Sequence, residues 1–414
     1  MSALLITDIG LLVGIHPKNV LVLKGSAMGA LPAVNNAWIL CESGLITRFG
    51  SMDNIPTDLP TSLTSVSANG GYVFPSWCDS HTHIVFASSR EEEFEMKIQG
   101  KSYEEIAAAG GGILNSAHKL QKVSEDSLFE SASMRLNDMI KLGTGAVEIK
   151  SGYGLTVDSE LKMLRVIKRI KEAFKIPVKA SFLAAHTYPE NYKNDHNAYI
   201  QLIVDKMLPQ IADEGLADYM DVFCEKGFFS VDETDKLLDV AAKYGLPPKI
   251  HANQLSISGG VQVGVKHNAV SVDHLEVTDK EAVRCLSKSN TIATLLPSCS
   301  LFLGIPFANA RNLIDADIPV ALASDFNPGS TPSGNMNLVV SLGCIKLKML
   351  PEEAINAATL NGAAAIQLSD ITGSIAIGKK ANLFITRPMS SLAYLPYSFG
   401  QSQIEKVVLN GEIY

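Results

Sequence analysis

Short apolar runs alternate with longer segments of helical periodicity between about residues 72 and 372 of this 414-residue chain. Eight of these runs are bounded by Gly, Pro or polar residues, which is typical of short buried strands. Strands that alternate with helices predict an α/β fold, and eight of them predict a (β/α)8 barrel of the TIM type. A doubly wound parallel sheet would produce a similar pattern, so this second architecture stays open here. The predicted strands are 71–77, 145–149, 178–183, 219–223, 248–251, 269–273, 291–296 and 319–323.

The segments between the predicted strands carry signals for helices. Residues 158–175 repeat their apolar side chains at helical spacing, so one face of this helix is expected to pack against the barrel. Two capping boxes predict where other helices begin, one formed by Ser230 with Glu233 and one by Thr278 with Glu281. These signals support the alternation of strands and helices.

Both ends of the chain have a different character, with short β-like pieces separated by Gly, Pro, Asn and Ser. Residues 1–72 and 373–414 are therefore predicted to form one small β-sandwich domain, and the barrel, residues 73–372, is predicted to be inserted between them. The clearest pieces are 19–24, 37–41, 45–49, 378–385 and 406–411.

The composition narrows the partners and the compartment. A formal net charge of −8 argues against a nucleic-acid or anionic-membrane partner, since both require a basic surface. An anionic substrate must therefore be bound by one or two local cations. No apolar run reaches the roughly 18 residues of a membrane span. The six cysteines contain no Cys-x-x-Cys pair, which favours reduced thiols, and we expect a cytoplasmic protein.

Two histidines one residue apart, His81 and His83, follow the first predicted barrel strand. In an extended chain, residues i and i+2 lie on the same face, so both imidazoles are expected to point the same way. They could share one metal ion. A bare His-x-His pattern is equally compatible with two ordinary strand histidines, and the remaining strand ends must decide between these interpretations.

Polar side chains gather at the ends of the other predicted strands, where a barrel would bring them to one mouth. Five of the nine histidines follow such strands, more than scattered surface histidines would be expected to do. The residues at strand ends are His81, His83, Glu148, Lys150, Tyr153, His186, Glu225, His251, Gln254, His274 and Asp325.

Three imidazoles and one carboxylate, those of His81, His83, His251 and Asp325, suit a borderline divalent ion such as Zn²⁺ or Fe²⁺ with room for a water molecule. A metal of this kind lowers the pKa of bound water towards roughly 7. The strand ends therefore predict a hydrolase.

Several motifs resemble the amidohydrolase superfamily. They are Val-Phe-Pro-x-x-x-Asp-x-His-Thr-His at 73–83, the later His251, His274 and Ser324-Asp325, and Gly-x-Ile-x-x-Gly-Lys-x-Ala at 373–381. Four further segments are similar to the imidazolonepropionase family within that superfamily, namely 110–113, 148–155, 221–227 and 324–329. The resemblance covers nearly the whole chain, and the last three segments are specific.

The resemblance implies a role for each site residue. The metal ligands are His81, His83, His251 and Asp325, which would hold one divalent metal, zinc or iron (Fe²⁺ or Fe³⁺). His274 and Asp325 are the implied catalytic residues, which transfer protons. The implied substrate contacts are Arg90, Tyr153, His186 and Gln254, with Asn327, Gly329 and Ser330 near the ring or the opened product.

The resemblance also implies the reaction, which is hydrolysis of the ring amide of 4-imidazolone-5-propanoate to N-formimidoyl-L-glutamate in histidine degradation. The expected partner is this small anionic imidazolone, whose propanoate would pair with the planar guanidinium of Arg90. We further expect a homodimer, with no nucleic acid and no membrane as partner.

Three positions depart from the family pattern. Gln254 stands where some members have Glu, so a hydrogen-bonding role is predicted for it rather than that of a general base. Ser76 replaces a Gly, and Asn382 replaces an acidic residue of the tail motif. Another cyclic amidohydrolase is an alternative. An aminohydrolase of the superfamily would share the metal ligands but should carry a strong acid at position 254. A silent scaffold should have lost the ligands, and all four are present.

Each assignment has a simpler interpretation as well. Arg90 could belong to a solvated charge run with the three glutamates that follow it. His186 could be a core histidine, and Tyr153 a loop aromatic residue. Glu225 ends the fourth predicted strand and could bind a second metal, although one metal is preferred. The glycines at 110–112 could cradle an anion, but flexible loops use such runs more often.

Overall fold

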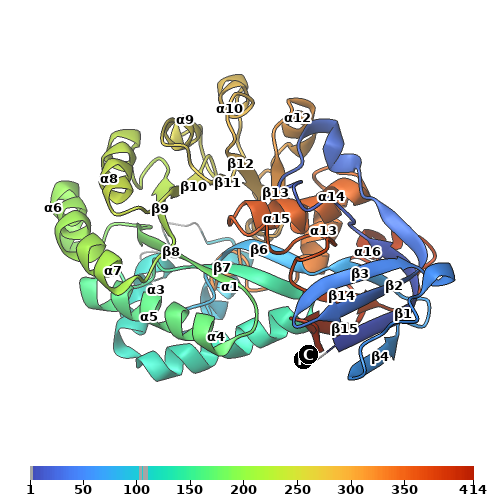
Figure 1. The fold of residues 1–414 in the computed structure, drawn as a ribbon. Helices are drawn as coiled ribbons and strands as arrows, with labels where there is room; N and C mark the ends of the chain where they lie inside the picture. Colours follow the sequence, from blue (N-terminus) through green and yellow to red (C-terminus); the bar gives the residue numbers. More distant parts are fainter. Residues whose placement is uncertain (1–2, 102–104, 106–110) are drawn as a thin grey trace.

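The computed structural model describes residues 3–101, 105 and 111–414. Eight parallel strands, β6 to β13, form one sheet in sequence order, and helices surround it (Figure 1). This arrangement confirms the predicted barrel class. The strands are β6 (Trp77–Thr82), β7 (Thr144–Lys150), β8 (Val178–Ala185), β9 (Tyr219–Cys224), β10 (Pro248–Ala252), β11 (Ser271–His274), β12 (Ile292–Leu295) and β13 (Val320–Leu322).

The barrel is nearly closed where the chain after β13 meets β6. The backbone N–H of Asp325 donates to the carbonyl of His81 (3.0 Å), and that of His83 donates to the carbonyl of Phe326 (2.8 Å). Thr82 and Phe326 form a parallel bridge between these hydrogen bonds. The seam of the barrel therefore fixes three predicted site residues relative to one another through their own backbone.

Helices follow most barrel strands and bury one apolar face each. The predicted helix at 158–175 is α5, whose Met163, Ile167 and Ile170 are fully buried. The helices are α1 (Glu91–Ile98), α3 (Gly112–Lys122), α4 (Glu125–Lys141), α5 (Val157–Ala173), α6 (His196–Leu202), α7 (Leu208–Glu214), α8 (Val231–Lys243), α9 (Gly260–Lys266), α10 (Lys280–Leu286), α11 (Pro297–Leu303), α12 (Ala310–Asp315), α13 (Met336–Ile345), α14 (Pro351–Ala358), α15 (Leu360–Ala364) and α16 (Tyr394–Tyr397).

One of the two predicted capping boxes is present. Ser230 accepts from the backbone N–H of Glu233, and the Glu233 carboxylate accepts from the backbone N–H of Ser230, at the start of α8. The box predicted at Thr278 is wrong. Asp279 caps α10 instead, because its carboxylate accepts from the backbone N–H of Ala282 (2.7 Å).

The two chain ends form a second sheet beside the barrel, with strand order β16-β15-β14-β5-β1-β2-β3 and β4 paired with β1. Leu45 in β3 bridges Lys380 just before β14, so the sheet folds back around a core that includes Ile6, Ile39 and Leu383. Its strands are β1 (Ala3–Val13), β2 (Ala33–Glu42), β3 (Leu45–Ser51), β4 (Leu63–Ser67), β5 (Tyr72–Pro75), β14 (Leu383–Thr386), β15 (Ile404–Leu409) and β16 (Glu412–Ile413).

Three strand predictions differ from the structure. Of the run 378–385, only the part from Leu383 on is a strand, β14. Residues 19–24 are not a strand; they lead into a short 3-10 helix, Gly25–Gly29. The run 71–77 divides at Ser76, because the backbone there changes its hydrogen-bonding partner. Ser76 N–H donates to the Asn382 carbonyl of the end sheet (3.0 Å), whereas Trp77 N–H donates to the Gly143 carbonyl of the barrel (2.9 Å).

Asn382, one of the departures from the family pattern, joins the two sheets. Its amide nitrogen Nδ2 donates to the carbonyl of Gly145 at the start of β7 (2.9 Å), and its Oδ1 accepts from the backbone N–H of Asn410 (2.8 Å). A carboxylate could not donate the first of these bonds. The amide therefore serves the contact between sheets, away from the strand ends.

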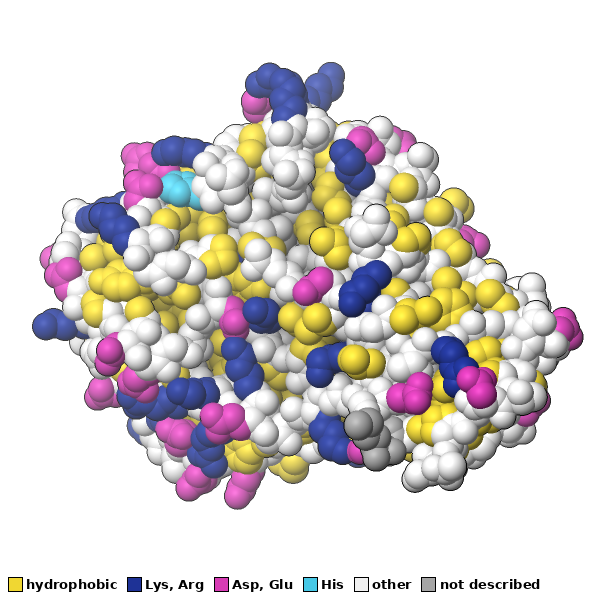
Figure 2. Space-filling view, in the orientation of Figure 1, with side chains coloured by type: hydrophobic (Ala, Val, Ile, Leu, Met, Phe, Trp, Pro, Cys, Tyr) yellow, Lys and Arg dark blue, Asp and Glu magenta, His cyan; other side chains and the backbone are white. Residues whose placement is uncertain are grey.

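The surface carries mixed charge. Figure 2 shows Lys and Arg interspersed with Asp and Glu on one face of the molecule, among the side chains that the structure describes. Within the same described residues, no helix combines the length and the apolar character that crossing a membrane requires.

Candidate metal and substrate site

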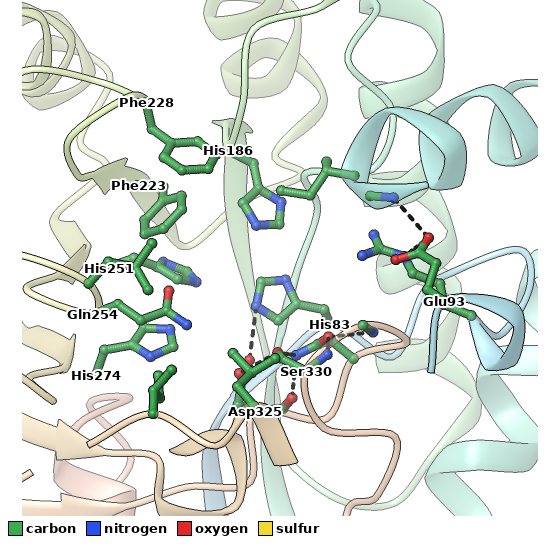
Figure 3. A pocket seen from close by; sticks show the side chains of 18 of the residues that line it. His83, Glu93, His186, Phe223, Phe228, His251, Gln254, His274, Asp325 and Ser330 are labelled. Carbon is green, nitrogen blue, oxygen red and sulfur yellow. Dashed lines mark hydrogen bonds and ion pairs between the residues drawn. The ribbon is translucent and has the colours of Figure 1, made fainter. Parts of the chain in front are cut away.

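A cavity of about 550 Å³ opens where the barrel strands end. Of the twelve predicted site residues, all except His81 line it, and His81 is fully buried beneath. In Figure 3, His83, Asp325 and Ser330 lie together, His251, Gln254 and His274 come from the opposite wall, and Glu93 lies apart on the far side. The fold thus gathers residues from positions 81 to 330 around one cavity.

The predicted metal ligands converge at the base of this cavity. The Nε2 atoms of His81 and His83 are 3.3 Å apart, and Asp325 Oδ1 lies 3.5 Å from each of them. His251 joins the two other histidines in a group whose ligand atoms all lie within 4.8 Å of one another. The spacing of residues i and i+2 in an extended chain therefore places both imidazoles as predicted.

Two buried carboxylates orient these imidazoles. His81 Nδ1 donates to Asp273 Oδ2 (2.7 Å), and His251 Nδ1 donates to Asp221 Oδ1 (3.1 Å), because an ionised carboxylate can only accept. The Nε2 atom of each ring is then unprotonated and available as a ligand. Burial also lowers the pKa of His81 and of His83 well below the usual value, so both rings are neutral at pH 7.

Three buried imidazoles, two of them oriented by carboxylates, beside a further carboxylate form the donor set that a divalent transition metal prefers. His81, His83, His251 and Asp325 therefore fit such an ion.

His274 lies on the other side of the cluster and has a carboxylate partner of its own. Its Nδ1 donates to Glu276 Oε1 (3.2 Å), which also accepts from Ser300 Oγ (3.3 Å). Burial acts to lower the pKa of His274, but the charge and hydrogen bond of Glu276 outweigh it and raise the pKa. The same ring approaches His81 and Asp325, so His274 can exchange a proton there.

The backbone is strained at both predicted catalytic residues. His274 has φ 87° and Asp325 has φ 56°, in the left-handed region that residues with a Cβ seldom adopt. Such conformations persist where surrounding contacts fix them, and they concentrate at functional sites.

A short turn after β13 holds Asp325. Asn327 Oδ1 accepts from the backbone N–H groups of Gly329 and Ser330 (both 2.8 Å), while its Nδ2 donates to the Asp325 carbonyl (2.7 Å). Ser330 Oγ donates to Asp325 Oδ2 (3.1 Å). A Cβ at position 329 would lie 2.4 Å from Arg90 Nη1, so only glycine fits there without a shift. This turn therefore connects the end of the cavity that holds the predicted metal ligands (the metal end) to the end that holds Arg90 (the cationic end).

Arg90 provides a buried cation at the far end. Its Nε donates to Ser116 Oγ (2.8 Å), and Glu93 Oε1 is 3.9 Å away. Its Nη2 is buried and has no hydrogen-bond partner among the described residues. A guanidinium with a buried, unpaired donor is suited to a carboxylate ligand. The Arg90 side chain is only 9% exposed, so the solvated charge run does not account for it.

His186 and Tyr153 form the wall between the two ends. The His186 ring stacks on His83 at a centroid distance of 5.5 Å, and its Nδ1 donates to the Gly152 carbonyl (3.1 Å). Burial lowers the pKa of His186 to about 3, which leaves the ring neutral. The Arg90 guanidinium lies 5.6 Å from the centre of the Tyr153 ring. Both side chains line the cavity. This position would not be expected if His186 were only a core histidine and Tyr153 only a loop aromatic residue.

Gln254 and Glu225 lie at the ends of β10 and β9. Gln254 lines the cavity, and its Nε2 donates to Cys299 Sγ (3.5 Å). The Glu225 carboxylate instead accepts from two backbone N–H groups of the loop after β10, those of Leu255 (3.0 Å) and Ser256 (3.3 Å). Glu225 belongs to none of the metal-ligand groups found among the described residues.

An anion cradle at 110–112, the less favoured interpretation of these glycines, is tested only in part, because residue 110 lies outside the described residues. The backbone N–H of Gly112 donates to Glu93 Oε1 (2.8 Å) at the start of α3. This N–H thus has a carboxylate partner within the chain.

Sequence reasoning missed the residues behind the ligands. Asp221, Asp273 and Glu276 each accept from a site histidine, and the fully buried Asp79 accepts from the backbone N–H (3.0 Å) and the Oγ (2.6 Å) of Ser324. Burial raises the pKa of Asp79 to about 7. Carboxylates inside otherwise apolar strands were the available signal, since such groups are seldom buried unpaired.

Comparisons with known proteins identify the family. The model of the amidohydrolase family matches residues 72–414. The chain belongs to this family. It is 55% identical over 410 residues to the imidazolonepropionase of Christiangramia forsetii and 54% identical over 409 residues to that of Flavobacterium johnsoniae, with 99% of both chains covered in each case. A zinc-bound adenosine deaminase from Xanthomonas campestris has a similar fold, with a TM-score of 0.72, 15% identity, and 99% and 92% of the two chains covered.

Proposed function

We propose that this enzyme hydrolyses the ring amide of 4-imidazolone-5-propanoate to N-formimidoyl-L-glutamate, a step of histidine degradation. The observation that carries the proposal is the pairing, in one cavity, of a metal-binding cluster with a buried arginine whose Nη2 is unpaired among the described residues. A hydrolytic centre at one end and a carboxylate-binding cation at the other match a cyclic amide with an acidic tail. The imidazolonepropionases at 54–55% identity support the same substrate.

His81, His83, His251 and Asp325 would hold one divalent metal ion. When bound, this ion supplies Lewis-acid activation of water for attack on the ring carbonyl. The remaining chemistry falls to side chains. Asp273 and Asp221 hold the imidazoles in the tautomer that presents Nε2, and Ser330 keeps Asp325 oriented through Oδ2.

Proton transfer is assigned to Asp325 and His274. The attacking water loses a proton to the Asp325 carboxylate, and the carbon–nitrogen bond of the ring then breaks as that proton passes to the leaving nitrogen. His274 Nδ1 is bound to Glu276, so its Nε2 is the atom that can donate to the oxygen on which charge develops. One water is consumed, and one amide bond is replaced by a carboxylate and the freed nitrogen.

Substrate orientation is assigned to Arg90 at the cationic end of the cavity and to the wall formed by Tyr153 and His186. Arg90 would pair with the propanoate, and the aromatic faces of Tyr153 and His186 would flank the ring. Gln254 would hydrogen-bond to the ring, because an amide both donates and accepts but is not a base at neutral pH. Asn327, Gly329 and Ser330 would contact the ring or the opened product while holding Asp325.

An aminohydrolase of the same family is the second candidate. The likeness to the deaminase structure stands at 15% identity and concerns the fold. Position 254 carries Gln rather than an acid, and the neutral amide favours ring hydrolysis over loss of an exocyclic amino group.

The choice between zinc and iron, a homodimeric assembly and a cytoplasmic location stay predictions. Metal analysis of protein purified under anaerobic conditions, together with its mass in solution, tests the first two.

The deciding experiment follows the ultraviolet absorbance of freshly prepared imidazolone propanoate with native, metal-stripped and His274→Ala protein. Native protein should consume the substrate, stripped protein should not, and H274A should be slow. The absence of turnover by metal-replete protein, or full turnover after complete stripping, would contradict the proposal.

A further inference from the structure

Lys150 lies beneath the metal-binding cluster and is fully buried at the end of β7. Its ammonium nitrogen Nζ is 2.7 Å from Glu148 Oε1, 2.8 Å from Asp221 Oδ2 and 3.7 Å from Asp273 Oδ2. All three carboxyl groups are fully buried as well. A charged side chain is seldom buried unless it is paired, so this cluster is held together by its own ion pairs.

Two of these carboxylates are the groups that orient the metal-binding histidines. Asp221 contacts Lys150 through Oδ2 and His251 through Oδ1, so one carboxylate joins the ammonium to the imidazole. Asp273 receives His81 Nδ1 on the oxygen that faces Lys150. The lysine thus lies between the partners of two ligands that come from β6 and β10, on separate parts of the barrel.

Without the Lys150 ammonium, Glu148 and Asp221 lose their ion pairs with this lysine. Among the described residues, Asp273 keeps an ion pair with Lys249, whose Nζ lies 3.7 Å away and donates to Ser271 Oγ (2.7 Å) and the Ala365 carbonyl (3.0 Å). A buried carboxylate that loses its ion pair is left with an uncompensated charge, so it is expected to move from its place. Asp221 would then no longer hold the Nδ1–H of His251, and the ring orientation that presents Nε2 to the ion would lose its support.

We propose that Lys150 is a positioning residue of the metal centre, which keeps Asp221 and Asp273 in place so that His251 and His81 present Nε2 to the ion. The inference rests on the proposed function only in its assignment of the metal ligands. In this proposal, Lys150 supports the binding of the metal ion and does not contact the substrate.

A second buried lysine offers a matched control. Lys379 is also fully buried, but its Nζ is bound to the carbonyls of Ser369 (2.5 Å) and Thr372 (3.4 Å) and to Ser374 Oγ (2.8 Å). These partners are neutral, and none contacts a site histidine. Lys150→Met and Lys379→Met therefore remove the same group from two buried positions, and only the first lies behind the metal ligands.

The test measures the dissociation constant for Zn²⁺ by competition with a chromophoric chelator, without any substrate. Loss of a partner behind a metal ligand typically weakens binding about 10- to 100-fold. K150M should show a loss of this size, and the Co²⁺-substituted protein should show an altered visible spectrum. K379M should keep wild-type affinity and spectrum even where its melting temperature falls. Wild-type affinity in K150M, or an equal loss in both variants, would overturn the proposal.

A double-mutant cycle with Asp221→Asn distinguishes action through Asp221 from a general effect of misfolding. Changes that act through one group are not additive, so the loss of Zn²⁺ affinity in K150M/D221N should be smaller than the two single losses combined. The part that passes through Asp273 and His81 should remain in the double variant. Fully additive losses would contradict the assignment.

If K150M does not fold, Glu148→Gln/Lys150→Met removes one charge of each sign and leaves the balance of buried charge unchanged. This variant should fold and still bind Zn²⁺ weakly, and wild-type affinity in it would overturn the proposal. Because every readout is metal binding, a failed substrate assay leaves this result unaffected.

Discussion

The two ends of the cavity are built in different ways. At the metal end, the ligands lie on or directly after barrel strands, and His81 and His251 are each bound to a buried carboxylate. At the cationic end, Arg90 precedes α1 and relies on Ser116 and a distant Glu93, both from segments outside the strands. Strand backbones restrict the position of a side chain more than connecting segments do. The metal end is thus suited to fixed chemistry and the cationic end to substrate selection.

Removal of the metal should have the largest effect, because it abolishes the function of one whole end. Stripping with a chelator should lower kcat/KM at least about 1000-fold, since a metal contributes several kcal/mol to the transition state. The ultraviolet assay before and after addition of Zn²⁺ measures this change. Recovery of activity on adding metal is the control for denaturation. Undiminished activity in metal-free protein would show that the end of the cavity with the predicted ligands does not work through a metal ion.

His274→Asn should have the next largest effect. Loss of general acid–base transfer lowers rates by about 100- to 10,000-fold, so kcat should fall by this amount while KM changes little. Steady-state kinetics measures both constants. The Zn²⁺ affinity should stay near that of the wild type, because His274 is not one of the four proposed ligands. A rise in KM with unchanged kcat would place His274 in substrate binding instead.

Arg90→Met should act on binding alone and more weakly. A hydrogen bond to a charged group contributes about 1.5–3 kcal/mol, so KM should rise about 10- to 100-fold with kcat nearly unchanged. A substrate analogue whose propanoate is replaced by its neutral amide is the matched control, since wild type and R90M should process it alike. Equal discrimination between acid and amide by both proteins would show that another group recognises the tail.

Lys97→Met should give the smallest change. Lys97 lines the same end of the cavity, is half-buried, and donates to the Gly329 carbonyl (3.3 Å). Partly exposed charges contribute at most about 1 kcal/mol, so KM should rise no more than about fivefold, and the effect should shrink at high salt. A larger rise in KM that does not depend on salt would show that Lys97 contributes as much as Arg90 to binding of the substrate carboxylate.

Local patterns were sufficient for the barrel strands and for the ligands that follow them. Buried parallel strands are short apolar runs in any sequence context, and a side chain just after such a strand must face the mouth. His81 and His83 lie on one face because alternate residues of an extended chain do so. The same reasoning failed at 71–77, because no local signal marks the change of hydrogen-bonding partner at Ser76.

The sequence by itself determined that short strands alternate with helices and that histidines and an aspartate follow the strands, because periodicity and strand ends are local properties. Only the tertiary structure decided that Asp221, Asp273 and Lys150 stand behind those ligands and that the Arg90 Nη2 is buried without a partner among the described residues. These relations join residues up to 192 positions apart. They depend on how strands pair across the barrel and on which charges are shielded from water, and neither property is local.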